Sequence, residues 1–144
     1  MRYNPDIQYS TQKAFVDTVI KTGSKYKNSV VLDANLSSII GTQNFAKAFP
    51  ERHFNFGNAV ENMLGAAVGF AARGKIPFVC SYALSITGES WDQIRNYICC
   101  PNVNVKIIGT HAGLLRGEEG AMYQSLEDIA IMTGGTLLSL FWSF

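Results

Sequence analysis

Five short apolar segments recur along this 144-residue chain, and stretches of helical pattern separate them. Strands that are apolar on both faces belong to parallel sheets covered by helices on both sides. With right-handed crossovers, the alternation predicts an α/β fold, a three-layer sandwich around a mainly parallel sheet. The segments are SVVLDA (29–34), HFNFG (53–57), IPFVCSY (76–82), VNVKIIGT (103–110) and TLLSLF (136–141).

Helical patterns fill the intervals between the predicted strands. In the first helix Phe15, Val19 and Ile20 share one face, and Ser10 or Thr11 can cap its start. No repeat, low-complexity tract or linker divides the sequence, so we expect residues 1–144 to form a single domain. The predicted helices cover 9–25, 41–50, 58–73, 86–99 and 123–132.

Composition narrows the classes of partner. Charged residues make up 16% of the chain, below the quarter or so that is usual, which indicates that a partner covers part of the surface. A net charge of +1 with scattered basic residues argues against nucleic acid or a membrane as a ligand. The three cysteines and two histidines are not spaced as zinc ligands, and we find no signal peptide or long apolar run. We therefore expect a cytoplasmic protein with reduced thiols and no metal site of its own.

Ligands of parallel α/β sheets approach the carboxyl ends of the strands, which here are 33–38, 57–61, 81–85 and 110–123. Two features have both a structural and a functional interpretation. Glu61 lies in the first turn of a nearly all-apolar helix, where the helix dipole alone favours a carboxylate by about 0.3–1 kcal/mol. Gly65 and Gly69 of the same helix suit close packing on the sheet or a helix crossing at a subunit interface.

Seven stretches, taken together, resemble the pyrimidine-binding domain of transketolase, and more closely the carboxy-terminal chain of split transketolases. The resemblance runs from about residue 10 to residue 132. Each stretch is weakly specific alone, but their shared order and spacing indicate homology, and the family's α/β sandwich agrees with the fold predicted above. The stretches are LDANLSS, FPERHFNFG, GKIPFVCSYA, WDQIRN, PNVNVKIIGTHAGL, GEEGA and QSLEDIA.

The resemblance implies a cofactor and a partner. In this family thiamine diphosphate lies between a domain that holds Mg²⁺ and the phosphates and the pyrimidine-binding domain of a neighbouring subunit. A glutamate hydrogen-bonds the pyrimidine, the thiazolium carbon loses its proton, and a two-carbon unit passes from a ketose to an aldose, both phosphorylated sugars. The cofactor carries the chemistry and the protein orients it. This chain would supply the pyrimidine half of the site, in a homo- or hetero-oligomer with a diphosphate-binding chain.

Two positions are candidates for the family's glutamate. Where the family reads G-I-A-E-Q-N-M, residues 57–63 read GNAVENM, so an ungapped alignment places Val60 at the cofactor-activating position. One residue turns about 100° around a helix, so Glu61 then points elsewhere. An insertion at Asn58 and a deletion after Glu61 would restore Glu61 as the catalytic acid. Both alternatives remain open at this stage.

The resemblance also assigns roles to residues in other stretches. Tyr82 matches one of two aromatic residues that flank the pyrimidine, and Ser85 stands at the second position. His111 matches a histidine that contacts the substrate's phosphate, and we count it as a second catalytic candidate. Glu119 replaces an aspartate that meets a substrate hydroxyl, and Tyr123 replaces a second histidine. These exchanges move a carboxylate and remove a proton donor, which is expected to slow ketol transfer.

The family continues beyond the strand matched by TLLSL into a third domain, whereas this sequence ends at Phe144. We therefore expect a shortened chain that lacks the third domain. Two functions stay open. The chain is either a transketolase-like subunit that works with a diphosphate-binding partner, or a non-catalytic pseudo-subunit that serves assembly or regulation.

Overall fold

A computed structural model describes residues 10–114, 120–133 and 141–143. The helices are α1 (Thr11–Lys25), α2 (Ser37–Ile40), α3 (Gln43–Ala48), α4 (Val60–Ala72), α5 (Trp91–Gln93) and α6 (Asp128–Thr133). The strands are β1 (Ser29–Asp33), β2 (His53–Asn55), β3 (Ile76–Tyr82), β4 (Lys106–Thr110) and β5 (Phe141–Ser143). The 3₁₀ turns η1 (Pro50–Arg52) and η5 (Ala121–Tyr123) and the π-helical segments η2 (Ser85–Glu89) and η3 (Ile94–Cys99) lie between them.

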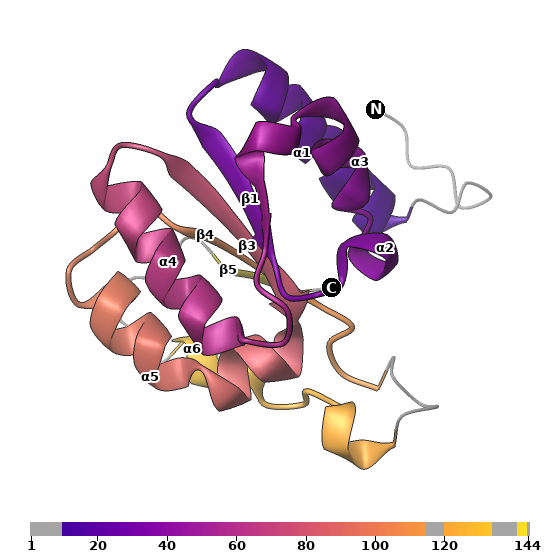
Figure 1. Cartoon of the computed structure of the whole chain (residues 1–144). Helices are drawn as coiled ribbons and strands as arrows, with labels where there is room; N and C mark the ends of the chain where they lie inside the picture. Colours follow the sequence, from indigo (N-terminus) through magenta and orange to yellow (C-terminus); the bar gives the residue numbers. More distant parts are fainter. Residues whose placement is uncertain (1–9, 115–119, 134–140, 144) are drawn as a thin grey trace, which may run out of the picture.

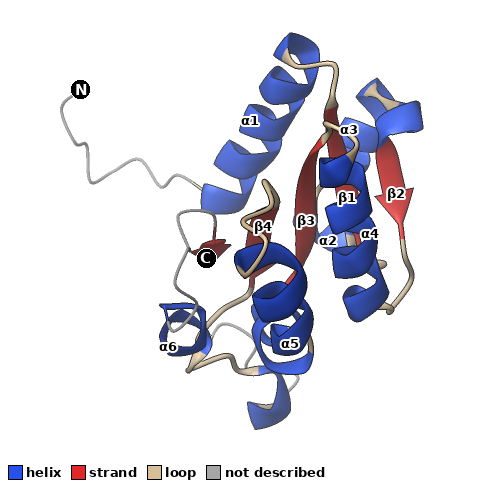
Figure 2. Cartoon of the chain, turned by 90° about the vertical axis from the view of Figure 1, so that its left-hand side faces the viewer, coloured by secondary structure: helices blue, strands red, loops and turns tan. Residues whose placement is uncertain are grey.

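The five strands form one sheet in the order β2-β1-β3-β4-β5, and each neighbouring pair is parallel. Helices α1 and α3 cover one face of this sheet, and α4 and α5 cover the other (Figure 1). Figure 2 shows the strands side by side with α4 and α5 in front of them. The predicted three-layer sandwich with a parallel sheet is therefore confirmed.

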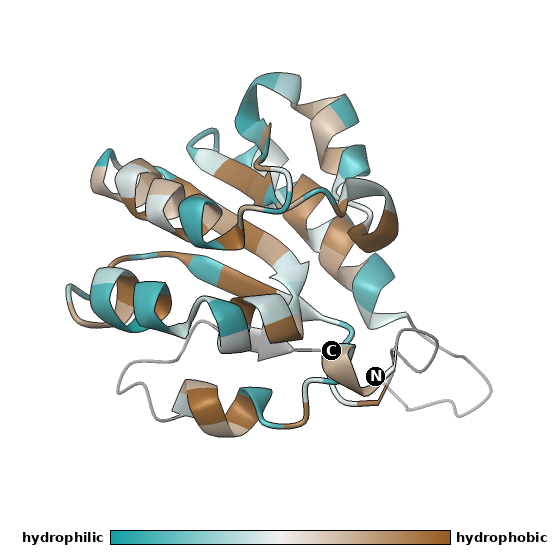
Figure 3. Cartoon of the chain, turned by 60° about the horizontal axis from the view of Figure 1, so that its bottom comes forward, coloured by the Kyte–Doolittle hydropathy of each residue, from teal (hydrophilic) through white to brown (hydrophobic). Residues whose placement is uncertain are grey.

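Strand β1 supplies apolar side chains to both layers. Val30 and Leu32 pack in the cluster beneath α4, and Val31 packs in the cluster beneath α1 and α3. Successive side chains of a strand point to opposite faces, so one short apolar run fills two cores. In Figure 3, apolar residues colour much of the strands, and the helices beside them carry both hydrophobic and hydrophilic residues.

Helix α1 forms as its sequence predicts. The Ser10 hydroxyl caps its start by accepting a hydrogen bond from the Lys13 amide at 3.2 Å. Val19 is 1% exposed and packs in the same cluster as Phe45 of α3. A Cβ atom added at Gly23 would lie 2.6 Å from the Phe45 ring, so glycine is what lets the two helices approach.

Three predicted helices differ from the structure. The segment predicted at 41–50 contains α3, and the separate short helix α2 precedes it, because Gly41 between them adopts a left-handed conformation with φ of 91°. The segment predicted at 86–99 contains α5 between the π-helical η2 and η3. The last predicted helix begins at Asp128 instead of Tyr123, which ends the 3₁₀ turn η5.

The predicted last strand, 136–141, lies mostly outside the described residues, and Phe141 begins β5. Among the helices that the structure describes, none is both long and apolar enough to cross a membrane.

Candidate functional site

The chain reverses its direction of travel across the sheet between β1 and β3. From β1 it moves outward to β2, and it then crosses back through α4 to β3 on the other side of β1. In open α/β sheets, ligands bind at such a switch point, beyond the carboxyl ends of the strands. The fold therefore predicts a ligand site at the carboxyl ends of β1 and β3.

A cavity of about 340 Å³ lies at this switch point. Each of the four stretches expected at the strand ends contributes residues to its lining, and η2 contributes one more. The volume is within the range usual for small-molecule sites. The described lining residues are Ala34, Leu36, Asn58, Val60, Ser81, Tyr82, Ser85, Glu89 and Tyr123.

The start of α4 brings Val60 to the cavity and leaves Glu61 outside it. Before this helix, the Asn55 side chain accepts a hydrogen bond from the Gly57 amide at 2.8 Å, and Gly57 turns the chain with φ of 60°. Val60 is 6% exposed, packs in the core cluster beneath α4 and lines the cavity. Glu61 is exposed and is not among the described lining residues. Val60, which the ungapped alignment places at the cofactor-activating position, is thus the one of the two residues that lines the cavity.

Tyr82 and His111 lie next to each other at the ends of β3 and β4. Their ring centroids are 5.3 Å apart in an edge-to-face arrangement, and only Tyr82 is among the described lining residues. The His111 Nδ1 atom lies 3.1 Å from the hydroxyl of Thr110. His111 has a φ of 56°, which is uncommon outside glycine and is enriched at functional positions. The site therefore has a histidine held beside, but not in, the cavity.

Ser85 and Glu89 begin and end η2, and both line the cavity. The hydroxyl of Ser90 donates to the carbonyl of Ser85 at 3.0 Å, and the hydroxyl of Thr87 donates to the carbonyl of Ala83 at 2.9 Å. Sequence reasoning proposed Ser85 and missed Glu89. The sequence did contain a signal for Glu89. This carboxylate follows Ser85 by four residues, a spacing that places two side chains on the same face of a helix.

The remaining candidates follow β4. Tyr123 ends η5, is 43% exposed and lines the cavity. Glu119 lies outside the described residues.

A second polar cluster lies at the end of β1, on the opposite face of the sheet from α4. The Asp33 carboxylate is fully buried, accepts a hydrogen bond from Thr42 at 2.8 Å and lies 2.6 Å from Nε2 of His53. Its other oxygen has no hydrogen-bond partner within the part of the chain that the structure describes. Burial, and then the charge of Asp33, raise the pKa of the neighbouring Cys80 thiol far above its usual range. None of these residues lines the cavity, so the cluster belongs to the core.

The cavity fits the aminopyrimidine half of thiamine diphosphate better than the diphosphate half. Val60 and Leu36 offer apolar walls, and Tyr82 offers an aromatic ring. The Asn58 amide can donate to a ring nitrogen, and the Glu89 carboxylate can accept from the amino group. Among residues 10–114, 120–133 and 141–143, no three acidic, histidine or cysteine side chains are grouped to hold a metal ion.

The sequence also matches known proteins. Residues 7–134 match the family described as transketolase, pyrimidine binding domain. The chain belongs to this family. Because the match covers most of the chain, the resemblance inferred from the seven stretches is confirmed.

Individual relatives point to split transketolases. The chain is 51% identical over 121 residues to the "Putative transketolase C-terminal section" of Methanocaldococcus jannaschii, covering 84% of this chain and 38% of that protein. It is 33% identical over 118 residues to a 6-deoxy-6-sulfo-D-fructose transketolase subunit of Clostridium sp. (strain MSTE9), covering 82% of this chain and 37% of that protein. A solved structure, titled as a split gene transketolase in an inactive beta4 tetramer, superposes with a TM-score of 0.74 at 45% identity, covering 85% of this chain and 39% of that one. This transketolase-like chain therefore spans about two fifths of the relatives it matches.

Proposed function

We propose that this chain supplies the pyrimidine-binding half of a thiamine diphosphate site for two-carbon ketol transfer between phosphorylated sugars, with a diphosphate-binding chain as its partner. The observation that carries the proposal is the cavity at the β1/β3 switch point, lined by Val60, Tyr82 and Ser85. Sequence alignment with the family nominates these three residues independently of the coordinates. The residues that the resemblance assigns to the cofactor therefore lie on one surface.

The bound cofactor would supply a nucleophilic thiazolium carbon for the reaction. The residues of this chain would bind and orient its other ring. Buried Val60 and partly buried Leu36 exclude water from one side, and Tyr82 offers a face or edge for ring contact. His111, held 5.3 Å from the Tyr82 ring, would meet the substrate's phosphate, and Tyr123 and Glu119 would meet its hydroxyls.

An exposed apolar stretch supports a partner chain. Leu114, Met122, Leu126 and Ile129 are between 66% and 84% exposed, and Tyr123 in the same stretch lines the cavity. Apolar side chains gathered on a surface mark interaction sites. A partner seated here would border the cavity through Tyr123, which fits a cofactor site shared between two chains. A solved relative is titled as a beta4 tetramer, which supports assembly of this chain with copies of itself when the partner is absent.

The second candidate is a non-catalytic pseudo-subunit. It is favoured by one observation, that Val60 lines the cavity and Glu61 lies outside it. In the ungapped alignment, Val60 stands where the family has its cofactor-activating glutamate. Such a chain would assemble with the same partner without contributing turnover.

Calorimetry separates these functions. We expect no tight binding of thiamine diphosphate with Mg²⁺ to this chain alone, because no three acidic, histidine or cysteine side chains are grouped among the described residues to hold the metal ion. Mixing it with the diphosphate-binding chain of a split transketolase should create binding and ketol transfer. Assembly with cofactor binding but no transfer would favour the pseudo-subunit, and no assembly would overturn both.

Substitution at the start of α4 tests the orientation of the site. Val60→Glu should raise ketol transfer by the assembled chains about a hundredfold, because a carboxylate then faces the pyrimidine. The matched variant Glu61→Gln changes the neighbouring, exposed position and should alter the rate by less than about threefold. Loss of turnover in Glu61→Gln with no gain in Val60→Glu would instead support the shifted alignment.

A further inference from the structure

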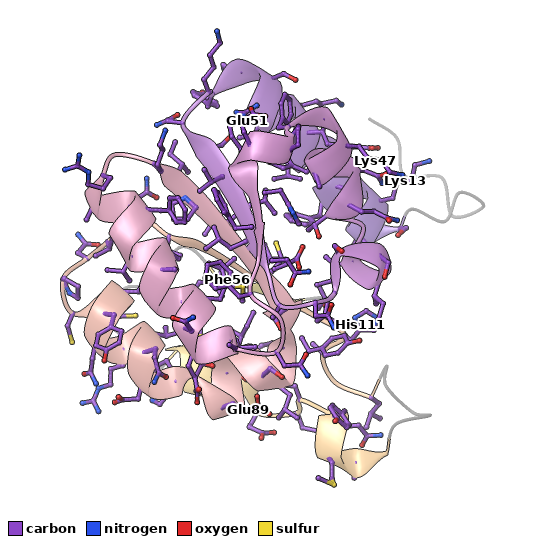
Figure 4. The ribbon with its side chains drawn as sticks, viewed as in Figure 1. Lys13, Lys47, Glu51, Phe56, Glu89 and His111 are labelled. Carbon is purple, nitrogen blue, oxygen red and sulfur yellow. The ribbon has the colours of Figure 1, made fainter. Side chains whose placement is uncertain are left out.

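The cavity contains a carboxylate that no aligned motif nominates. Glu89 is the one acidic residue among the described lining residues, and no lysine, arginine or histidine is among them. Figure 4 places Glu89 and His111 in the lower half of the view, far from Glu51 at the opposite end of the sheet. The remaining polar lining groups are hydroxyls and one amide, so Glu89 sets the sign of the charge in the cavity.

The backbone that presents Glu89 is firmly held. Ile86 and Thr87, inside the same π-helical segment, are 0% and 1% exposed, and Ser90 directly after Glu89 is fully buried. Two side-chain hydrogen bonds, from Thr87 and from Ser90, tie the segment to the end of β3 and to its own first residue. Single-turn π-helical segments occur frequently at functional sites because they re-aim a side chain. Glu89 is therefore a fixed part of the cavity rim.

The carboxylate itself is not used by the fold. Within the described residues the Glu89 carboxylate takes part in no hydrogen bond and no ion pair, and the residue is exposed. An uncompensated negative charge repels phosphate and attracts groups that donate hydrogen bonds or carry positive charge. Of the two ends of thiamine diphosphate, only the amino-bearing pyrimidine has that character.

We infer that Glu89 is a binding residue for the aminopyrimidine, accepting a hydrogen bond from the amino-bearing ring and holding it in a cavity whose other wall is Val60. This inference rests on the proposed function and adds a residue and a charge preference to it. Glu89 would position the ring in the absence of a carboxylate at residue 60. It would also favour the protonated ring over the neutral one, since a charge-assisted hydrogen bond is the stronger.

The experiment measures the dissociation constant of thiamine diphosphate by calorimetry in the complex with the diphosphate-binding chain. Glu89→Gln should weaken binding about tenfold, because it keeps an acceptor oxygen but replaces a charge-assisted hydrogen bond with a neutral one. The control is Asp92→Asn, which removes the same charge three residues away, outside the described lining, and can keep the hydrogen bond that Asn96 donates at 2.6 Å. This control should bind as the unaltered chain does.

A cofactor analogue whose ring lacks the amino group distinguishes direct contact from a general effect of charge. With this analogue, the unaltered chain and Glu89→Gln should bind within twofold of each other. If Glu89→Gln binds thiamine diphosphate as tightly as Asp92→Asn does, the inference is overturned and the proposed function stands. If the unaltered complex does not bind the cofactor at all, the proposed function falls, and the role of Glu89 falls with it.

Discussion

Two carboxylates near the carboxyl ends of the strands show how differently one fold uses the same chemical group. Asp33 is fully buried on the α1 and α3 side, where Thr42 and His53 contact one of its oxygens. Glu89 is exposed on the rim of the cavity and, within the described part of the chain, makes no hydrogen bond or ion pair. A buried carboxylate must be paired to be tolerated, whereas an open one is free to meet a ligand. We therefore expect Asp33 to stabilise the fold and Glu89 to bind a ligand.

Removing the enclosed carboxylate should have the largest effect. Asp33→Ala leaves Thr42 and His53 without their buried partner, so we expect the free energy of unfolding to fall by about 3–5 kcal/mol. Asp33→Asn keeps an oxygen for Thr42 and should lose about half as much. Urea denaturation followed by circular dichroism measures both. A loss below about 1 kcal/mol in both variants would show that the cluster does not hold the fold.

The buried thiol beside Asp33 should make the free energy of unfolding depend on pH. Burial, and next the charge of Asp33, raise the pKa of Cys80, so above about pH 9 the unfolded chain releases this proton while the folded chain keeps it. The unfolding free energy should therefore decline as pH rises, by about 1.4 kcal/mol per pH unit for this one group. Below pH 9 the thiol is protonated in both states and contributes no slope.

The Cys80→Ala variant should lose this component of the alkaline slope, and denaturation series at pH 8, 9 and 10 measure it as the difference between the two chains. Exposed Cys100 supplies the control, because Cys100→Ala should leave the slope unchanged. Equal slopes in all three proteins would mean that Cys80 ionises as easily in the folded state as in the unfolded one.

The sheet and its ends could be predicted from sequence because their signals are local. The apolar run of β1 fills both cores, and β3 begins and ends where IPFVCSY does. The conformation of η2 and the partners of Asp33 could not be predicted in this way, because they depend on residues brought together by the fold. His53 reaches Asp33 across a strand pair, from twenty positions away along the chain.

The sequence alone could likewise not tell whether Val60 or Glu61 lines the cavity. A one-residue shift of an alignment is invisible to composition, but it moves a side chain by about 100° around α4. Only the coordinates of the helix start distinguish buried Val60 from exposed Glu61. Glu89 could not be found from the sequence for a related reason, since its neighbours in the cavity come from the segment after β1, from the start of α4, from β3 and from η5.

Replacing the exposed carboxylate should have the smallest effect on stability. Glu89→Gln should change the free energy of unfolding by less than about 0.5 kcal/mol, because the exposed carboxylate has no partner within the described residues to lose. The fair reference is Asp33→Asn, which makes the same chemical change, carboxylate to amide, at the buried position. If the two variants lose equal stability in parallel urea titrations, burial and pairing do not make the two carboxylates differ in their contribution to stability. A loss confined to Asp33→Asn would mean that the fold requires one carboxylate and leaves the other available for binding.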